Sequence, residues 1–569
     1  MVKAAEYKKK NKRWLDLSSL VIWLGVILAA NFLGSLVFTR IDLTEENRYT
    51  LSDATKEQLE NLEDVVFIRV YLEGDLPTEF RELKDATREL LDEFRAYAGE
   101  NLQYEFINPS ASPDEKERVK VYEELTRQGL QYSNIRMATG DKMSEQIIFP
   151  GAIVSHMGRE TPVQLLKSIA GATEQEMIAS SIQQLEYEFV SAVRIVARGT
   201  KPAVAFIEGH GELDALETAD AERALSQFYE VSRVKIEQQV KALEGYKAII
   251  IARPDSAFSE QDKFIIDQFI MKGGRVLWMI DPVFARMDSL RQSNMTMGLV
   301  LEHNLEDQLF KYGARLNADL ILDLECIQKP IVTGFIGNQP RQEMFPWFYE
   351  PLLAGNNEHP ISKNLDRLKT EFVSTIEPIE VEGVTSTPLL LSSGKARLQR
   401  APVRISFNIL REPPKYEMFN SGPFIAGLLM EGTFPSVFTN RLPQKLTADK
   451  GLNFQEKSVP TKMIVVSDGD IICNPTNRLE QKFFALGFDK YTKRMYANRE
   501  FILNAMNYLC DDSGLLSLRD KDFKVRLMDQ EKVDTERYFW QVLNTGGPVM
   551  IVVIFGLVFF YWRRKKYVA

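Results

Sequence analysis

The sequence predicts an α/β protein in which two terminal transmembrane helices flank one large extracytoplasmic region. The first observation is a pair of uncharged apolar stretches, residues 17–39 and 538–562, near the ends of the 569-residue chain. The second is the basic sequence on the outer side of each stretch. The third is an alternation of apolar strand patterns and helical patterns between them. At about 1.5 Å of rise per residue, either stretch can cross a hydrocarbon core of roughly 30 Å.

The charged ends predict the topology. Residues 1–16 carry a net charge of +4, and residues 563–569 carry four basic residues and no acid. Because basic flanks stay on the cytoplasmic side, both termini are expected in the cytoplasm and the main body in the periplasm. A cleaved signal peptide is the alternative for the first stretch, and a buried soluble helix is the alternative for the second.

The overall charge restricts the partners. The chain carries -9, so the two basic ends leave -17 on residues 17–562. A body of this charge repels nucleic acid and anionic headgroups, so we expect no nucleic acid partner. The bilayer is an expected partner because of the two apolar stretches. The three cysteines, Cys326, Cys473 and Cys510, have no spacing typical of a metal site or a disulfide framework.

The first part of the body predicts a β-α-β unit over residues 65–109. A helix capped by Ser52 or Thr50 precedes it, and VVFIRVYL and LQYEFINP read as strands around a helix with apolar residues at helical spacing. A polar helix is expected near 114–128. The segments IIFPGAIVSH and TPVQLLKS then read as hairpin strands, and a long amphipathic helix near 174–197 is placed to bridge two domains.

From residue 201 the pattern becomes strand and helix in alternation. AVAFIE, KAIIIARP, RVLWMID and KMIVVSDGD are apolar strands, with helices such as SEQDKFIIDQFIMKGG between them. Continuous apolar strands of this kind predict a parallel sheet covered on both faces. Residues 330–455 are richer in proline and irregular, and they read as an inserted β-rich lobe.

Candidate binding residues follow the strands of this sheet, because open α/β sheets form their crevice at the carboxyl ends of the strands. We expect a ligand or partner site there, which could hold a divalent cation or a polar ligand because oxygen ligands suit hard cations, while the metal stays unassigned. The alternative is that these acids and glycines only cap helices and make turns. The candidates are Glu208, Gly209, His210, Gly211, Glu212, Asp255, Asp281, Asp468 and Asp470.

Catalytic motifs are largely missing from the sequence. It contains no GxxxxGK[ST], no HExxH and no GxSxG, which argues against a P-loop ATPase and a serine hydrolase of the usual kind. Ser392 and Lys395 fit an SxxK spacing, but no SDN or KTG accompanies them. We therefore predict no catalytic residue and no cofactor.

Three stretches together resemble a known family. RIDLTEENRYTLSDATKEQLENL with the strand after it, VAFIEGHGEL, and IIIARPDSAFSEQDKFIIDQFIMKGGRVLWMIDP look like the gliding-motility-associated ABC transporter auxiliary component (GldG-like) of Bacteroidota. The resemblance implies a glutamine-amidotransferase-like, flavodoxin-like fold, also seen in intraflagellar-transport proteins. It also implies an ABC-2-type permease subunit and a separate cytoplasmic ATPase subunit as partners.

The expected protein is thus a non-catalytic auxiliary subunit of an inner-membrane transporter, and homo-oligomerisation stays open. A membrane-tethered solute- or polymer-binding protein is the first alternative, and an envelope hydrolase or amidase is the second. The predicted parts are a basic tail (1–16), a membrane helix (17–39), an α/β domain (40–173), a bridging helix (174–200), a flavodoxin-like domain (201–329 and 456–512), its β-rich insert (330–455), a stalk (513–537), a membrane helix (538–562) and a basic tail (563–569).

Overall fold

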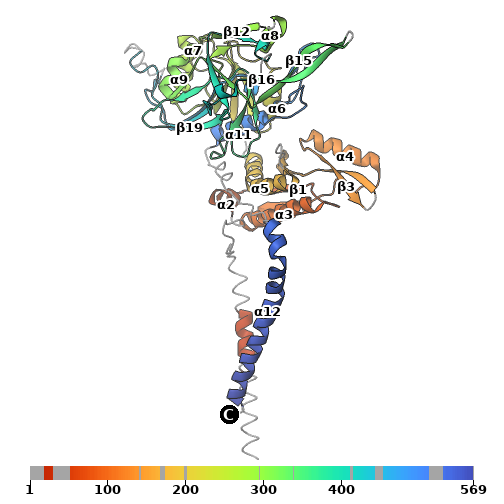
Figure 1. The fold of residues 1–569 in the computed structure, drawn as a ribbon. Helices are drawn as coiled ribbons and strands as arrows, with labels where there is room; N and C mark the ends of the chain where they lie inside the picture. The colour runs from red at the N-terminus through yellow and green to blue at the C-terminus, as the bar shows by residue number, and fades with distance from the viewer. Residues whose placement is uncertain are drawn as a thin grey trace, which may run out of the picture.

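The computed structural model places three parts one above another along the molecule: a sheet-rich head, a smaller N-terminal unit and a long C-terminal helix (Figure 1). We use "N-terminal unit" for residues 51–197 and "head" for residues 201–511. The structure describes residues 18, 20–29, 51–139, 142–166, 173–197, 201–293, 295–336, 339–410, 414–441, 453–511 and 530–567.

The N-terminal unit is built on a four-stranded sheet in the order β2-β1-β5-β6. Strands β1 and β2 are parallel neighbours joined through α3, which confirms the β-α-β unit, and β5 and β6 form the expected hairpin. Its elements are α2 (Asp53–Glu60), β1 (Val66–Val70), α3 (Thr78–Ala98), η1 (Gly99–Asn101), β2 (Leu102–Phe106), α4 (Glu115–Arg127), β3 (Ser133–Thr139), β4 (Lys142–Ile148), β5 (Gly151–His156), β6 (Arg159–Gln164) and α5 (Glu174–Ala197).

Local chemistry accounts for the helix boundaries in this unit. The Ser52 hydroxyl accepts a hydrogen bond from the backbone of Thr55 and caps α2, while Asp114 caps α4 through the Lys116 amide. The apolar stripe of α3 packs against α5, and both helices share one core with β1. The sequence therefore determines this unit largely through capping and periodicity.

A ten-stranded mixed sheet forms the centre of the head. Strands β8, β7, β9, β10 and β23 are parallel neighbours, and β22, β19, β16 and β15 continue the sheet in antiparallel fashion. The members are β7 (Ala203–Glu208), β8 (Glu230–Lys235), β9 (Ala248–Ala252), β10 (Arg275–Met279), β15 (Cys326–Ile336), β16 (Gln339–Gly355), β17 (Leu368–Lys369), β19 (Val384–Leu391), β22 (Ile425–Gly432) and β23 (Thr461–Val466).

Helices cover both faces of the parallel half. Ile250 of β9 shares a core with α6 and α11, whereas its neighbours Ile249 and Ile251 share a second core with α7 and α9. Successive side chains of a strand point to opposite faces, so a strand that is apolar throughout must be buried on both. The helices of the head are α6 (Ala219–Leu225), α7 (Glu260–Met271), α8 (Met287–Ser293), α9 (Glu306–Tyr312) and α11 (Asn498–Cys510).

Residues 330–455 differ from the predicted arrangement. The segment is β-rich as expected, but β19 and β22 extend the central sheet rather than forming a lobe of their own. The reason is that Leu389, Leu390 and Leu429 pack in the same core as Ile250. Smaller sheets and turns complete the head: β11 (Val283–Phe284), β12 (Met295–Val300), β13 (Ala314–Leu316), β14 (Asp319–Asp323), β18 (Ile376–Pro378), β20 (Ala396–Arg400), β21 (Val403–Ser406), β24 (Thr476–Asn477), β25 (Lys482–Phe483), η2 (Phe407–Leu410), η3 (Tyr416–Met418) and η4 (Asp470–Ile472).

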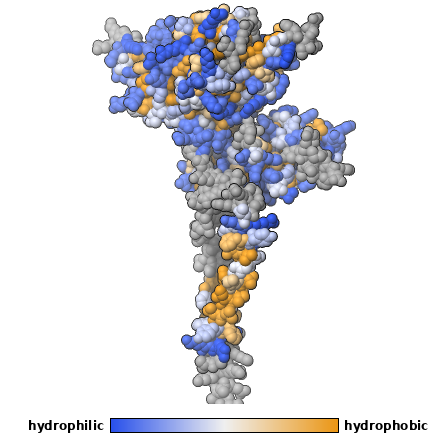
Figure 2. Space-filling view, viewed as in Figure 1, coloured by the Kyte–Doolittle hydropathy of each residue, from blue (hydrophilic) through white to orange (hydrophobic). Residues whose placement is uncertain are grey.

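The C-terminal helix α12 (Gln530–Tyr567) leaves the globular parts as a single rod. Its segment Thr535–Lys565 is long and apolar enough to cross a membrane, and none of that apolar surface is buried within the protein. Figure 2 shows the corresponding apolar band, with hydrophilic residues at both ends of the helix. The helix continues through Pro548 without interruption.

The first predicted membrane helix is described only in part. Leu20–Ala29 forms an apolar helix of exposed side chains, shorter than a full span. The remainder of 17–39, apart from Ser18, lies outside the described residues, as does most of the expected stalk at 513–537. One candidate membrane span is thus established by length and composition, and the second stays a prediction.

Candidate functional site

The end of β7 and the loop that follows it carry five of the predicted site residues, and the histidine of the loop is packed inside the head. The His210 ring stacks on Phe258, with ring centroids 3.7 Å apart and an interplanar angle of 13°. Its Nδ1 lies 3.1 Å from Glu212 Oε1, and its Nε2 lies 3.3 Å from Asp262 Oδ2. Both ring nitrogens are therefore occupied by carboxylates of the protein itself.

Electrostatics favour the charged form of this histidine. Burial lowers the pKa of His210, but the hydrogen bonds and charges of Glu212 and Asp262 outweigh it and hold the pKa above its usual range. Asp262 is fixed in turn, because it lies in the first turn of α7 and accepts hydrogen bonds from Ser259 Oγ and the Gln238 amide. The arrangement ties the β7 loop to α7, and it leaves neither ring nitrogen open to a ligand.

Two glycines shape the same loop. Gly209 and Gly211 both adopt positive φ, 123° and 75°. The backbone oxygen of His210 accepts hydrogen bonds from the amides of Asp255 and Ser256, which brings the β7 and β9 loops together. A side chain at Gly211 would collide with Asp255. The close approach explains why glycine occupies this position.

Glu208 ends β7 and serves as a structural ion-pair partner. Its Oε1 accepts a hydrogen bond of 2.6 Å from Arg233 Nη1 on β8. The same guanidinium also binds Glu222 of α6 and the Thr218 hydroxyl. The arginine therefore joins two strands and a helix, and Glu208 lies within that network.

The remaining carboxylates gather beyond β10 and β23, where the crevice was expected. Asp468 accepts hydrogen bonds from the amides of Asp470 and Glu371, and Asp281 accepts one from Gly469. Arg253 forms an ion pair with Asp470. The structure thus brings Asp281, Asp468 and Asp470 together in the interior of the head.

Burial raises the pKa of Asp281, Asp468 and the neighbouring Glu371. It raises the pKa of Asp281 to about 7 and that of Glu371 to about 8, and it holds the pKa of Asp468 above its usual range. Repulsion between the neighbouring carboxylates adds to the effect, while Arg253 opposes it at Asp281. The raised pKa values reduce the negative charge that these neighbouring carboxyl groups carry together.

Little room remains for a ligand at the strand ends. Asp255 makes a hydrogen bond with Ser256 and a longer contact of 3.5 Å with Arg286. The cavity that Asp255, Asp281 and Asp470 share has a volume of about 10 Å³, roughly the space of one water. Within the described residues, no group of three or more His, Cys, Asp and Glu side chains is arranged to hold a metal ion.

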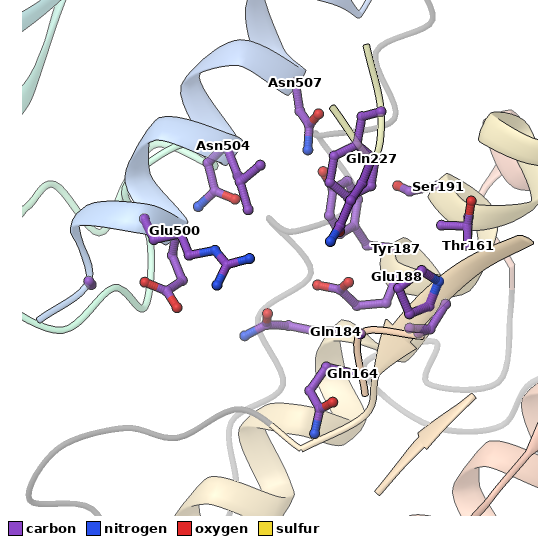
Figure 3. Close-up of a pocket in the computed structure, with 18 of the residues that line it drawn as sticks. Thr161, Gln164, Gln184, Tyr187, Glu188, Ser191, Gln227, Glu500, Asn504 and Asn507 are labelled. Carbon is purple, nitrogen blue, oxygen red and sulfur yellow. The ribbon is translucent and has the colours of Figure 1, made fainter. Parts of the chain in front are cut away.

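A far larger cavity lies elsewhere, between the N-terminal unit and the head. We call it the interdomain cavity; it has a volume of about 850 Å³. Figure 3 shows α11 along one side of it, with α5 and β6 along the other and Gln227 between them. The two parts are joined beside it by an ion pair between Arg194 of α5 and Asp511. This cavity could not be predicted from the sequence, because its polar, charged and aromatic lining comes from segments that are far apart in the chain.

Comparison with known protein families identifies the family to which the head belongs. The profile of the family described as an ABC-type uncharacterized transport system, an auxiliary component, matches residues 201–505, which is more than half of the chain. The chain belongs to this family. A second profile, a domain of unknown function (DUF7088), matches residues 45–155 of the N-terminal unit.

Membership in this transporter auxiliary family indicates a role beside a transporter rather than in catalysis. No curated protein matches the chain. Among solved structures, the mmIFT52 N-terminal domain is 13% identical, with 54% of this chain and 96% of that chain covered and a TM-score of 0.31. A ThuA-like protein from Parabacteroides merdae ATCC 43184 is 10% identical, with 55% and 90% covered and a TM-score of 0.26. At these scores neither structure bears on fold or function.

Proposed function

We propose that this protein is a non-catalytic auxiliary subunit of an inner-membrane ABC-2-type transporter associated with gliding motility. Its head and N-terminal unit would stand over the permease on the periplasmic side, with both termini in the cytoplasm. The observation that carries the proposal is the transporter auxiliary profile over residues 201–505, on a head joined to the apolar helix α12. The link to gliding and the flavodoxin-like description of the head come from the sequence resemblance alone.

The chemistry of the chain supports a division of labour with other subunits. The sequence has no P-loop, so a separate cytoplasmic ATPase would supply the energy. The histidine and carboxylates at the strand ends are engaged with one another and with the backbone. A head stabilised in this way is suited to holding a fixed shape over a partner.

The proposal is tested by topology and by copurification from the native membrane. A reporter fused at residue 300 should give a periplasmic signal, and one fused after residue 569 a cytoplasmic signal. The tagged full-length chain, extracted in mild detergent, should bring down a multispan permease and an ATPase that mass spectrometry identifies. A cytoplasmic signal at residue 300 would refute the topology, and purification without any transporter subunit would refute the assigned role.

A further inference from the structure

The interdomain cavity presents hydrogen-bonding groups that the protein does not use. Within the described residues, the side chains of Gln227 and Ser191 have no hydrogen-bonding partner. Asn507 accepts a hydrogen bond of 2.7 Å from the Tyr229 hydroxyl through Oδ1, which leaves its NH₂ group. Asn504 donates from Nδ2 to a backbone oxygen, which leaves its Oδ1. The cavity thus offers both donors and acceptors, and they come from both of its walls (Figure 3).

The acidic and basic side chains that line the cavity are equal in number. Four acids and four bases line the cavity, so it carries no net charge that would select an anion or a cation. The acids are Glu188, Asp366, Glu500 and Asp511, and the bases are Arg194, Lys201, Lys363 and Arg499. The net charge of the lining therefore favours neither an anionic nor a cationic ligand.

Aromatic rings complete the lining. Tyr132 is 56% exposed and borders the cavity, where Phe228 is also partly exposed. The flat apolar face of such a ring suits the C–H face of a sugar ring, while amides and hydroxyls suit sugar hydroxyls, each of which donates and accepts. A volume of about 850 Å³ lies within the usual range of small-ligand sites.

An extended peptide fits this cavity less well. A peptide would add most simply to the edge of β6, the outermost strand of the N-terminal sheet. Pro162 lies in the middle of β6 and has no N–H to donate. Gly129 also packs against the Pro162 ring, where an added Cβ would lie 3.1 Å from Pro162 Cγ. The strand edge is therefore protected against pairing.

We propose that the interdomain cavity binds an uncharged oligosaccharide, either free or as a stretch of a longer glycan. Carboxamides and hydroxyls from α5, α11 and the segment before β8 hold the sugar hydroxyls, and Tyr132 and Phe228 contact a ring face. This binding goes beyond the transporter role and does not depend on it, because every contact lies within one chain. Its failure is therefore distinguishable from a failure to copurify with a permease.

The test uses the full-length protein in lipid nanodiscs, since glucoside and maltoside detergents would compete for the cavity. A panel of neutral oligosaccharides from dextran, cellulose, mannan and xylan is titrated by calorimetry and by saturation-transfer NMR. Oligogalacturonate and a glycine-serine peptide serve as charged and peptidic probes. We expect at least one neutral oligosaccharide to bind, and neither of the other probes.

Single-residue variants test whether the oligosaccharide binds in the interdomain cavity. Gln227→Ala should weaken the affinity about five- to tenfold, since it removes a bidentate amide. Gln239→Ala, at an exposed glutamine outside the cavity, should leave the affinity unchanged. Ser191→Phe should fill part of the cavity and abolish binding, with an unchanged melting temperature showing that the variant folds.

Three results would overturn the proposal. The first is that no neutral oligosaccharide of the panel binds the folded protein. The second is that Gln227→Ala and Ser191→Phe keep the wild-type affinity, which would place the sugar elsewhere. The third is binding of the peptide or of oligogalacturonate in place of the neutral sugars, which would assign another ligand class.

Discussion

Gly209 and Gly211 show how single residues fix the loop between β7 and α6. Both have positive φ, a region that β-branched residues fit poorly. Gly209→Val should cost roughly 1 to 3 kcal/mol of unfolding free energy through backbone strain alone. Gly211→Val should cost more, because an added Cβ would lie only 1.7 Å from Asp255 Oδ1. Thermal unfolding of the full-length variants, monitored by near-UV circular dichroism, tests whether Gly211→Val lowers the stability more than Gly209→Val.

A glycine without positive φ serves as a control for the effect of replacing any glycine by valine. Gly334 lies in β15 without positive φ, and nothing stands within 4 Å of a Cβ placed there. Gly334→Val should therefore leave the melting temperature nearly unchanged. Equal melting of the Gly211 and Gly334 variants would show that the loop relaxes around the new side chain.

Glu371 should make the stability of the head depend on pH. Burial raises its pKa to about 8, with Glu350 and Asp470 adding to the shift and Lys329 and Lys369 opposing it. In the unfolded chain a glutamate has a pKa of about 4.3. Between about pH 4.5 and 8, the unfolded state therefore binds fewer protons than the folded state. The free energy of unfolding must then fall as pH rises through this window and level off above it.

Replacement by glutamine isolates that contribution. Glu371→Gln keeps the shape of the side chain and removes its ionisation, so its melting temperature relative to wild type should rise steadily from pH 5 to pH 8. Glu382→Gln, at an exposed position, is the control and should show a constant difference. A constant difference for Glu371→Gln as well would mean that this carboxyl is charged in the folded head.

At the scale of elements, the sequence predicted what local chemistry determines. The helix expected near 174–197 is α5, and the polar helix expected near 114–128 is α4, with Asp114 as its cap. The strand β9 reads AIIIA and is buried throughout, as expected of a parallel strand between two layers of helices. Each of these features depends on residues that are neighbours in the chain.

Elements that depend on distant partners were harder to predict. Strand β8 reads EVSRVK, and its polar residues gave no strand signal, since an edge strand is only half covered. Strand β22 pairs with β23 on one side and β19 on the other, so its place in the central sheet follows from long-range packing. Periodicity within 330–455 showed strands, but it could not show which sheet they join.

The residues of the candidate site also fall into those that the sequence predicted and those that it missed. We expected the candidate residues to meet at the carboxyl ends of the parallel strands. Asp281, Asp468 and Asp470 do lie together there, because the direction of the strands determines where the loops after them meet. The same expectation missed Glu371, which reaches the cluster from 97 residues away in the chain, and it missed Asp262, which holds His210. The interdomain cavity could not be predicted for the same reason, since its walls come from segments that are far apart in the chain.

At the scale of the whole molecule, α12 is the candidate membrane span that follows the globular parts. The helix has 38 residues without a break and is therefore about 57 Å long, which exceeds a hydrocarbon core of roughly 30 Å. If α12 spans a bilayer, part of the helix extends beyond the hydrocarbon core. The exposed apolar side chains of Thr535–Lys565 leave lipid or a membrane partner as their surroundings.

Removal of the chain from Thr545 onward should abolish association with the permease. The truncation deletes the apolar part of α12 and its basic end, so a body of roughly 500 residues would keep at most one anchor and no fixed orientation. A second variant, with residues 549–562 replaced by leucine, keeps a span of the same length and the same basic end. Copurification from native membranes compares both variants with wild type.

The leucine variant separates anchoring from recognition within the membrane. If α12 serves only as an anchor, the leucine helix should restore copurification that the truncation loses, because length and hydrophobicity alone determine insertion. If side chains of α12 pack on the permease, the leucine helix should insert but fail to restore it. Full copurification of the truncated chain would contradict both readings, and it would place the contact on the head, the N-terminal unit or the first apolar helix.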